Sequence, residues 1–303
     1  MSIVTLFGRW WTAFDYGILL PGLARLPMVQ ARSLARLRGR FYALIKRDWR
    51  TFSFADDQLY QRTFDVYKQL MPKATDAQCH ARVALRYEAQ SLEELEGACL
   101  PLCDISTWPL RVEGLEAVNA LLATKPRIVL LTAHFGSSIL GSTMLGCLGM
   151  PVLGMSSSVV DDPRVHPAIA RFYRRKYAAI TPYMNGGGII DRQGNAAKFV
   201  RFLLRGGAVG IVGDLPPDPG EQPLVKMFLG KQRGFAPGAV KLAEMTGAKI
   251  LAYVCVYSGG EYVLRFSAPE QDPYQFIEEA IRSEPSQWWA ADLLPLLPEY
   301  SND

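Results

Sequence analysis

The chain has 303 residues, 49% of them hydrophobic and 20% charged, which is enough apolar material for a folded core and excludes a disordered chain. Its 26 glycines and 20 prolines are scattered without a period, which excludes a collagen-like or low-complexity protein. The net charge of +4 is uneven, because residues 1–50 hold nine Lys or Arg against two acidic residues, a balance of +7, so the rest of the chain sums to −3.

The first 50 residues combine aromatic, aliphatic and basic side chains. Phe7, Trp10, Trp11 and Phe14 precede seven Lys or Arg residues in 32–50. There is no stretch of about 18 apolar residues, so we expect no membrane-spanning helix, and a cleavable signal peptide fits poorly. This composition suits a membrane interface with anionic headgroups. The alternative is an amphipathic helix that packs on the main domain with its arginines in water. No nucleic-acid-binding motif accompanies the basic stretch, so we expect no nucleic acid partner.

The spacing of apolar residues predicts two regions of different structure. In residues 1–110 apolar residues recur at helical spacing, which predicts helices over 32–50, 56–71 and 75–102, with Thr75 and Asp76 as candidate caps of the third. From residue 111 short aliphatic runs alternate with helical runs, which predicts βαβ units. The predicted strands are 128–132, 151–155, 208–212, 250–256 and 262–266. We therefore expect an α/β fold, a mostly parallel central sheet flanked by helices in 111–303, with an N-terminal helical extension in 1–110.

Two polar side chains directly follow predicted strands. His134 comes after the apolar run 127–133 and before Phe135-Gly-Ser-Ser138, a predicted turn and helix start. Asp214 comes after the strand predicted over 208–212. Because sites in such sheets form at the carboxyl ends of strands, His134 is the candidate catalytic base, and the Asp214 carboxylate can orient an imidazole or cap a turn. The candidate substrate-binding residues are Gly136, Ser137, Ser138, Phe228 and Arg233.

The remaining cysteine and arginine patterns concern compartment and partners. Five sparse cysteines favour a reducing compartment. Cys99 and Cys103 are spaced for one helix face, but no histidine lies near them in the sequence, so we expect no metal site there. Arg171, Arg174, Arg175 and Lys176 form a basic cluster on a predicted helix. Such a cluster suits docking of an acidic carrier protein, or it is a solvated helix face.

A series of short motifs, in a specific order and spacing, covers nearly the whole chain. The motifs are Arg111-Val-Glu-Gly-Leu-Glu116, His134-Phe-Gly136, Gly149-Met-Pro-Val152, Arg205-Gly-Gly-Ala-Val-Gly210, Gly213-Asp-Leu215, Phe228-Leu-Gly230, the run 238–248 and Glu284-Pro-Ser-Gln-Trp288. In these motifs the chain resembles the bacterial lipid A late acyltransferases, the lauroyl and myristoyl transferases, within the wider lysophospholipid acyltransferase-like superfamily.

The resemblance implies an activity and a location. It implies acyl transfer from an acyl-carrier protein or acyl-CoA to a hydroxyl, at the inner, cytoplasmic face of the membrane, with the acyl thioester as a substrate and no further cofactor. In that family a histidine and an acid five positions later form an H-x4-D/E motif, in which the histidine accepts the proton of the acceptor hydroxyl and the acid orients the imidazole. By this resemblance His134 is the base.

The chain departs from the family pattern at the acid, because Ile139 stands at that position and cannot ionise. The family's arginine after the next strand is also missing from Ser156-Ser-Ser158, and the closing tryptophan and arginine pattern is only partly kept in Gln287-Trp-Trp289. Three hypotheses follow. Another carboxylate substitutes, either Asp214 or one of Asp161 and Asp162. Alternatively the acceptor is an amine, which needs a weaker base, in an amide- or ester-forming condensing enzyme. In the third hypothesis the chain is catalytically inert and acts as a binding partner.

Overall fold

The computed structural model describes residues 3–114, 116, 119, 123, 124, 127–268 and 270–300. Its contacts divide the chain into two compact units, one made of Met1–Asp104 and Ser157–Ile180 and the other of Ile105–Ser156 and Thr181–Asp303. The sequence placed a boundary near residue 110. The contacts place it near 104 and add residues 157–180, which the sequence assigned to the α/β region, to the helical unit.

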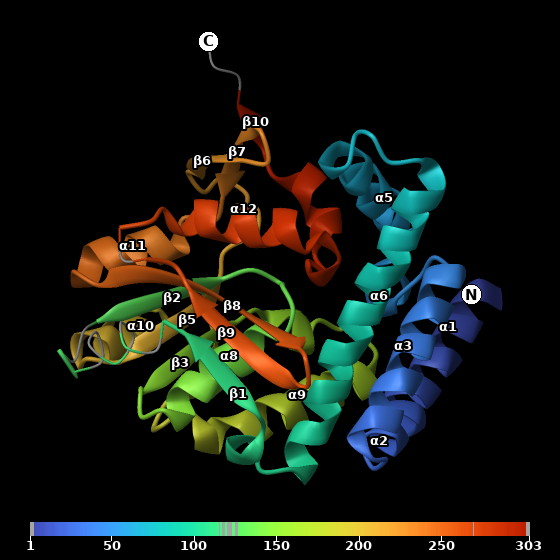
Figure 1. Cartoon of the computed structure of the whole chain (residues 1–303), viewed down its shortest axis with the longest axis horizontal. Helices are drawn as coiled ribbons and strands as arrows, with labels where there is room; N and C mark the ends of the chain where they lie inside the picture. Colours follow the sequence, from blue (N-terminus) through green and yellow to red (C-terminus); the bar gives the residue numbers. More distant parts are fainter. Residues whose placement is uncertain are drawn as a thin grey trace. The chain divides into compact units, whose positions relative to one another are not determined.

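The first unit is built from helices (Figure 1). Its elements are α1 (Ile3–Phe14), the π-helical turn η1 (Asp15–Leu19), α2 (Leu20–Leu23), α3 (Met28–Leu44), α4 (Trp49–Phe54), α5 (Leu59–Leu70), α6 (Asp76–Cys99), η2 (Leu100–Leu102), η4 (Ser158–Asp161) and α9 (Pro167–Ile180). Thr75 caps α6 in a capping box with Gln78, as the sequence predicted. The helix predicted over 32–50 is interrupted after Leu44, because Lys46 adopts φ 55° and Asp48 starts α4 with a capping box of its own.

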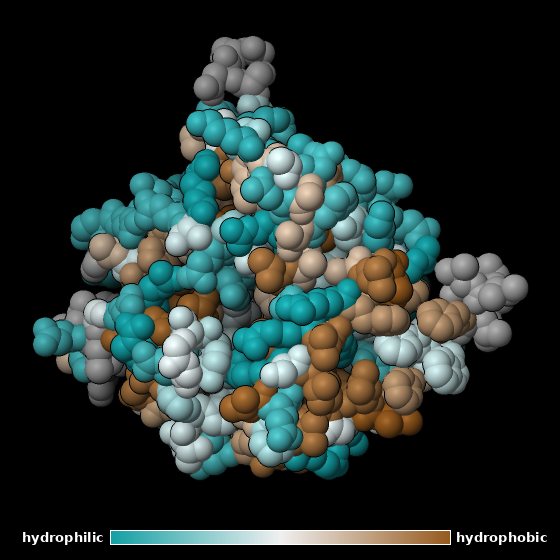
Figure 2. Space-filling model, turned by 45° about the vertical axis from the view of Figure 1, so that its right-hand side comes forward, coloured by the Kyte–Doolittle hydropathy of each residue, from teal (hydrophilic) through white to brown (hydrophobic). Residues whose placement is uncertain are grey.

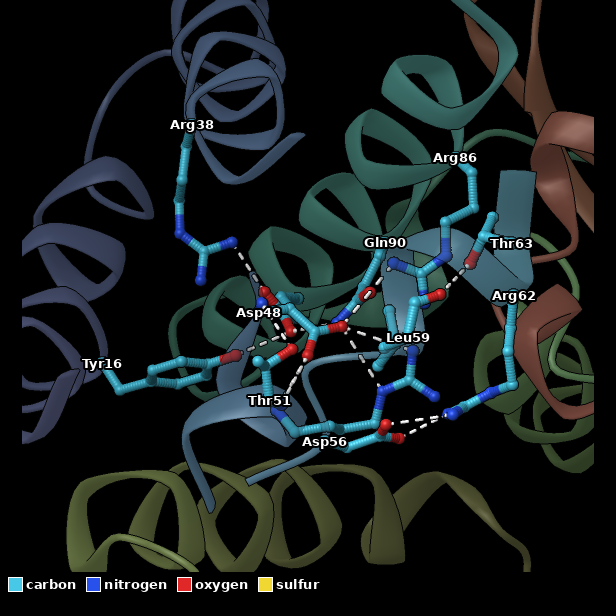
Figure 3. Close-up of polar contacts among 12 residues, drawn as sticks. Tyr16, Arg38, Asp48, Thr51, Asp56, Leu59, Arg62, Thr63, Arg86 and Gln90 are labelled. Atoms are coloured by element: carbon cyan, nitrogen blue, oxygen red, sulfur yellow. Dashed lines mark hydrogen bonds and ion pairs between the residues drawn. The ribbon is translucent and has the colours of Figure 1, made fainter. Parts of the chain in front are cut away.

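Buried charges join the helices of this unit. The Arg38 guanidinium lies between two carboxylates, at 2.5 Å from Asp15 and 2.6 Å from Glu94, and the Tyr16 hydroxyl donates to Glu94 at 2.7 Å. Close by, Asp48 accepts the backbone N–H groups of Arg50 and Thr51, and the buried Arg86 guanidinium lies 3.6 Å from it (Figure 3). Each charge is paired, which a buried ion requires.

The second unit is an α/β structure whose main sheet has the strand order β1-β9-β8-β2-β5-β3-β4 (Figure 1). The neighbours are parallel except β8 and β9, which form an antiparallel pair. The strands are β1 (Leu110–Glu113), β2 (Ile128–Thr132), β3 (Val152–Ser156), β4 (Gly188–Asp191), β5 (Ala208–Val212), β8 (Lys249–Ser258) and β9 (Glu261–Phe266). The expected mostly parallel sheet is thus confirmed, as is the α/β class.

Helices and short turns cover this sheet. They are η3 (Ile105–Thr107), α8 (Ser138–Cys147), η5 (Thr181–Tyr183), α10 (Ala196–Leu204), α11 (Gly238–Thr246), α12 (Pro273–Ser283), η6 (Pro285–Gln287) and η7 (Ala291–Leu296). The core strand β2 is buried at all five positions, which explains its unbroken Ile-Val-Leu-Leu run.

A second, small antiparallel sheet of order β10-β7-β6 was not predicted from the sequence. Its strands are β6 (Leu224–Phe228), β7 (Lys231–Phe235) and β10 (Glu299–Tyr300). Leu229 and Gly230 join β6 to β7 with φ values of 52° and 84°, a tight two-residue turn in which both residues are left-handed. Four prolines between Leu215 and Leu224 favour a loop in the sequence, so the hairpin that follows them was not predicted.

Candidate active site

The carboxyl end of β2 positions His134. The strand ends at Thr132, the chain turns, and α8 begins at Ser138, so the histidine lies between a strand end and a helix start, as the sequence predicted. Gly136 makes this turn feasible: it adopts φ 52°, and a Cβ there would lie 2.3 Å from the carbonyl oxygen of Cys255. The strand–turn–helix geometry therefore requires the glycine of the His-Phe-Gly motif.

Strand β5 brings Asp214 to the same edge of the sheet. β5 runs parallel to β2 with Val212 opposite Thr132, and each of the two site residues follows its strand by two positions. The imidazole Nδ1 of His134 lies 2.8 Å from Oδ1 of Asp214. The backbone N–H of His134 donates to Oδ2 of the same carboxylate at 3.0 Å. Of the three carboxylates proposed to replace the missing acid, Asp214 is the one that contacts His134.

The segment after α12 closes the other side of the pair. The indole Nε1–H of Trp288 donates to Oδ2 of Asp214 at 2.7 Å, and the Trp288 side chain is fully buried. The next residue, Trp289, presents its ring to the His134 imidazole edge-to-face, with 4.7 Å between ring centres. Its backbone N–H donates to the His134 carbonyl oxygen at 3.0 Å, and the backbone N–H of Gly136 donates to Gln287 at 2.9 Å. The sequence noted these tryptophans only as part of a family pattern.

These contacts fix the charge state of Asp214 and the tautomer of His134. Burial alone would raise the pKa of Asp214, but the electrostatic interaction with His134 and the hydrogen bonds from His134 and Trp288 outweigh it and hold this pKa below its ordinary value. An ionised carboxylate only accepts hydrogen bonds, so Nδ1 of His134 carries the proton and Nε2 carries the lone pair. Nε2 has no hydrogen-bond partner among the described residues, and the His134 side chain is 22% exposed. In the neutral imidazole this arrangement leaves Nε2 able to accept a proton.

Three candidate substrate-binding residues lie in the turn and at the first position of α8. Gly136, Ser137 and Ser138 are buried. The backbone N–H of Ser137 donates to Cys255 at 2.8 Å, and the Ser138 carbonyl accepts from the Tyr253 hydroxyl at 2.8 Å. The structure thus shows these groups holding α8 against β8, and their contact with substrate remains a prediction.

The other two candidates are also buried. Phe228 packs edge-on against both Phe235 and Trp288. Arg233, on β7, donates to the Leu294 carbonyl at 3.1 Å and lies 3.0 Å from Glu299. Both side chains secure neighbouring segments in the structure, and a substrate contact for them likewise remains a prediction.

The basic cluster lies on α9 in the first unit. Arg171, Arg174 and Arg175 are exposed, and Arg174 pairs with Asp161 at 2.5 Å. Lys176, which the sequence grouped with them, is instead buried and ion-paired with Glu93, because it lies on the opposite side of the helix. The remaining candidate acid, Asp162, pairs with Arg164 at 2.6 Å. Asp161 and Asp162 are thus both engaged by arginines.

The motif position Ile139 lies in the first turn of α8 and is half-buried. Within the described part of the chain, no group of three or more His, Cys, Asp or Glu side chains is arranged to hold a metal ion. The five cysteines are free thiols.

A comparison with protein families gives a match over most of the chain. The family model described as bacterial lipid A biosynthesis acyltransferase matches residues 57–290, which span both site strands and the Trp288–Trp289 segment. No curated protein matches the chain.

Proposed function

Because the chain belongs to the bacterial lipid A biosynthesis acyltransferase family, we propose that it moves an acyl group from an acyl-carrier protein or acyl-CoA to a hydroxyl acceptor, with His134 as the general base. The observation that carries this proposal is the His134–Asp214 pair. It supplies, from a different strand, the orienting acid that the H-x4-D/E motif lacks at Ile139.

The proposed reaction proceeds in two steps. Nε2 of His134 accepts the proton of the acceptor hydroxyl as its oxygen attacks the thioester carbonyl, and Asp214 stabilises the resulting imidazolium through Nδ1. The tetrahedral intermediate then collapses to the ester and expels the thiolate, which takes the proton back from Nε2. The donor thus leaves as a free thiol, and the enzyme returns to its starting protonation state.

The pair also favours a hydroxyl over an amine acceptor. The amine hypothesis depended on a histidine without an orienting acid, since an amine is already nucleophilic and needs less help. With Asp214 at 2.8 Å from Nδ1, the imidazole has the support that deprotonation of a hydroxyl requires. The inert hypothesis loses support for the same reason, because a scaffold has no need of a buried, ionised carboxylate aligned on a histidine.

Intact mass spectrometry tests this function. An acyl-loaded carrier protein is incubated with the enzyme and a lipid extract, and loss of the acyl mass is followed. We expect transfer by the wild type, none by His134→Ala, and a rate about 10^4-fold lower for Asp214→Asn, the order seen when a triad loses its orienting acid. The product should be cleaved by mild alkali, as an ester is and an amide is not. Equal rates for wild type and His134→Ala would contradict the proposal.

We propose that the carrier protein docks on Arg171 and Arg175 of α9. Carrier domains are acidic, and these guanidinium groups are exposed on one helix. Reversal of both charges to Glu should raise the KM for acyl-carrier protein several-fold and leave that for acyl-CoA unchanged. An equal effect on both donors would argue against docking at this helix.

We also propose that α1 and α3 contact the surface of the cytoplasmic membrane. Among the described residues no helix is long and apolar enough to cross a membrane. Large apolar side chains are nevertheless exposed in this segment, namely Phe7, Trp10, Ile18, Leu26, Val29, Leu34, Leu37 and Leu44. Figure 2 turns the side of the molecule with α1 and α3 forward and shows brown side chains gathered there beside hydrophilic ones. The exposed Arg9, Arg25 and Arg36 lie in the same segment, which suits anionic headgroups.

Point variants test membrane contact better than truncation does. Removal of residues 1–30 would delete Asp15 and leave its buried partner Arg38 with one carboxylate fewer. The triple variant Trp10→Ser, Ile18→Ser, Val29→Ser changes exposed groups only and should weaken co-sedimentation with phosphatidylglycerol-containing vesicles by about two orders of magnitude, from the apolar area that no longer inserts. Met245→Ser, at an exposed position of α11, is the matched control. Unchanged sedimentation of the triple variant would show that this face does not insert.

A further inference from the structure

The Asp214 carboxylate has two oxygens with different tasks. Oδ1 faces Nδ1 of His134 at 2.8 Å, and Oδ2 receives two donors, the backbone N–H of His134 at 3.0 Å and the indole N–H of Trp288 at 2.7 Å. The backbone donor belongs to the histidine itself, so Trp288 is the donor that ties the carboxylate to another part of the chain.

The surroundings of Trp288 make its indole a rigid support. The side chain is fully buried and packs edge-on against Phe228, which packs in turn against Phe235. Its backbone is held as well, since Phe135 and Trp288 form an isolated antiparallel bridge beside the hydrogen bond from Trp289 to His134. The indole N–H is thus held in place independently of the carboxylate to which it donates.

We propose that Trp288 is a positioning residue for acyl transfer: its indole N–H holds Oδ2 of Asp214, so that Oδ1 stays aligned on Nδ1 of His134 and the lone pair stays on Nε2. This inference rests on the proposed role of His134 as base. Trp288 itself touches neither reacting atom and acts through Asp214. Without the indole donor, Oδ2 keeps only the backbone N–H of His134, so the carboxylate is held less tightly and the imidazole has a less fixed acceptor to select its tautomer.

Among the described residues, Tyr274 is a titratable group that interacts electrostatically with Asp214 of the His134–Asp214 pair. On α12, the Tyr274 phenol stays protonated, because burial and then the charges of Asp214 and Asp272 raise its pKa. Asp272 is paired with Lys226 at 2.6 Å. β8 contributes Cys255, whose carbonyl oxygen holds Ser137. Removal of the indole N–H of Trp288 should therefore change which ring nitrogen of His134 carries the proton.

Two substitutions isolate the indole N–H. Trp288→Phe removes the donor and part of the ring. Replacement of Trp288 by benzothienylalanine, which has sulfur in place of the N–H, removes the donor and keeps the shape, so the test does not depend on whether the Phe variant folds. Trp108→Phe is the control in the same unit, since Trp108 stacks on Tyr262 and makes no contact with Asp214.

The first measurement needs no substrate. Nitrogen-15 NMR of ring-labelled histidine reports which ring nitrogen is protonated, and the chain has three histidines, so comparison with His134→Ala assigns the signals. At neutral pH we expect a proton on Nδ1 of His134 in the wild type and in Trp108→Phe, and a mixture of the two tautomers in both Trp288 variants. The Nδ1-protonated form alone in the benzothienylalanine variant would overturn the proposal.

The second measurement is the pH dependence of kcat/KM. We expect kcat to fall about tenfold to a hundredfold in the Trp288 variants, the effect of one charge-assisted hydrogen bond. The acid limb should shift, because a carboxylate with one donor fewer holds a proton more tightly and its hydrogen bond to the imidazole changes. A purely structural role would lower activity and leave the acid limb and the tautomer unchanged. If the wild type transfers no acyl group, the proposed function fails, and the NMR result still decides the role of Trp288.

Discussion

At the scale of single residues, the site pairs His134 with a carboxylate from another strand. The family motif expects an acid at position 139, where this chain has a half-buried isoleucine. The carboxylate that contacts the His134 imidazole belongs to Asp214, 80 residues further along the chain. A motif read along the chain suggested a weakened site, whereas the three-dimensional arrangement has a complete histidine–carboxylate pair.

Restoring the family acid should therefore bring no benefit. The single Nδ1–H of His134 is already donated to Asp214, and a second carboxylate nearby adds like-charge repulsion. We expect Ile139→Glu to have a kcat/KM on hydroxyl acceptors no higher than the wild type, with Ile139→Gln as the uncharged control of similar shape. Steady-state kinetics measure the effect, and a tenfold gain for the Glu variant alone would show that Asp214 is an inadequate substitute.

Gly136, in the turn after His134, has no room for a side chain. A Cβ at Gly136 would meet the Cys255 carbonyl at 2.3 Å in a left-handed backbone conformation. Gly136→Ala should destabilise the protein by about 1–3 kcal/mol and lower activity, because the strand-to-helix turn must shift. Gly238→Ala is the matched control, since nothing lies within 4 Å of a Cβ there and alanine favours the helix. Thermal unfolding of both variants measures the difference. Equal melting temperatures would contradict the expected strain at Gly136.

At the scale of secondary-structure elements, a helix cap and an ion pair set the break between α3 and α4, which apolar periodicity did not predict. The sequence predicted one helix over 32–50, but the chain forms α3 and α4, separated by the Lys46 turn and the Asp48 cap. Figure 3 shows the contacts of Asp48. Asp48 is buried beside Arg86, so the break in the helix is fixed by a partner 38 positions away. A pattern of apolar spacing carries no information about such a pairing.

The Asp48 contacts should make stability depend on pH. Burial alone would raise the pKa of Asp48, but Arg50, Arg86 and two backbone N–H groups outweigh it and lower this pKa from 3.8. A carboxyl with a depressed folded-state pKa stabilises the fold above its unfolded pKa, and this stability is lost as the pH falls through the folded value. We expect Asp48→Asn to cost about 3 kcal/mol at pH 7, because the guanidinium groups of Arg86 and Arg50 then face no carboxylate charge at position 48.

Denaturant unfolding at several pH values checks this prediction. The difference between wild type and Asp48→Asn should narrow as the pH falls from 3.8 towards the lower folded-state pKa of Asp48, because the unfolded chain takes up the proton first. Asp57→Asn is the control, because that carboxylate is exposed and pairs with Arg47 at the surface. A difference that stays constant with pH would mean that the ion pairs contribute nothing and that the side chain matters only as a cap.

At the scale of the whole molecule, the uneven charge is the most informative property of the sequence. The balance of +7 in residues 1–50 against −3 elsewhere places positive charge next to exposed apolar side chains. Arg32 and Arg38 are buried in ion pairs with Glu96, Asp15 and Glu94, so only part of that charge faces solvent. Arg9, Arg25 and Arg36 of this segment are exposed, and our membrane proposal assigns them to anionic lipids.

Membrane binding should accordingly depend on salt and on lipid charge. Screening shortens the range of exposed charges from about 10 Å at 0.1 M salt to about 3 Å at 1 M. Vesicle co-sedimentation should therefore be strong with phosphatidylglycerol at low salt, weaker at high salt, and weakest with phosphatidylcholine alone. Arg9→Gln with Arg36→Gln should reduce the salt dependence. If vesicle binding does not change with salt or with lipid charge, the arginines do not contribute to it and only the apolar side chains contact the membrane.

The sequence by itself determined the α/β class, the helical N-terminal region, the family and the position of His134 at a strand end, because these depend on local periodicity and on contiguous motifs. It also placed Asp214 at the same edge, since parallel strands align their carboxyl ends. Only the tertiary structure decided that Asp214 contacts His134, that Trp288 holds the carboxylate, that Lys176 is buried, and that β6 and β7 form a hairpin. Each of these depends on contacts between residues distant in the sequence or on the backbone angles of a turn, which no local pattern encodes.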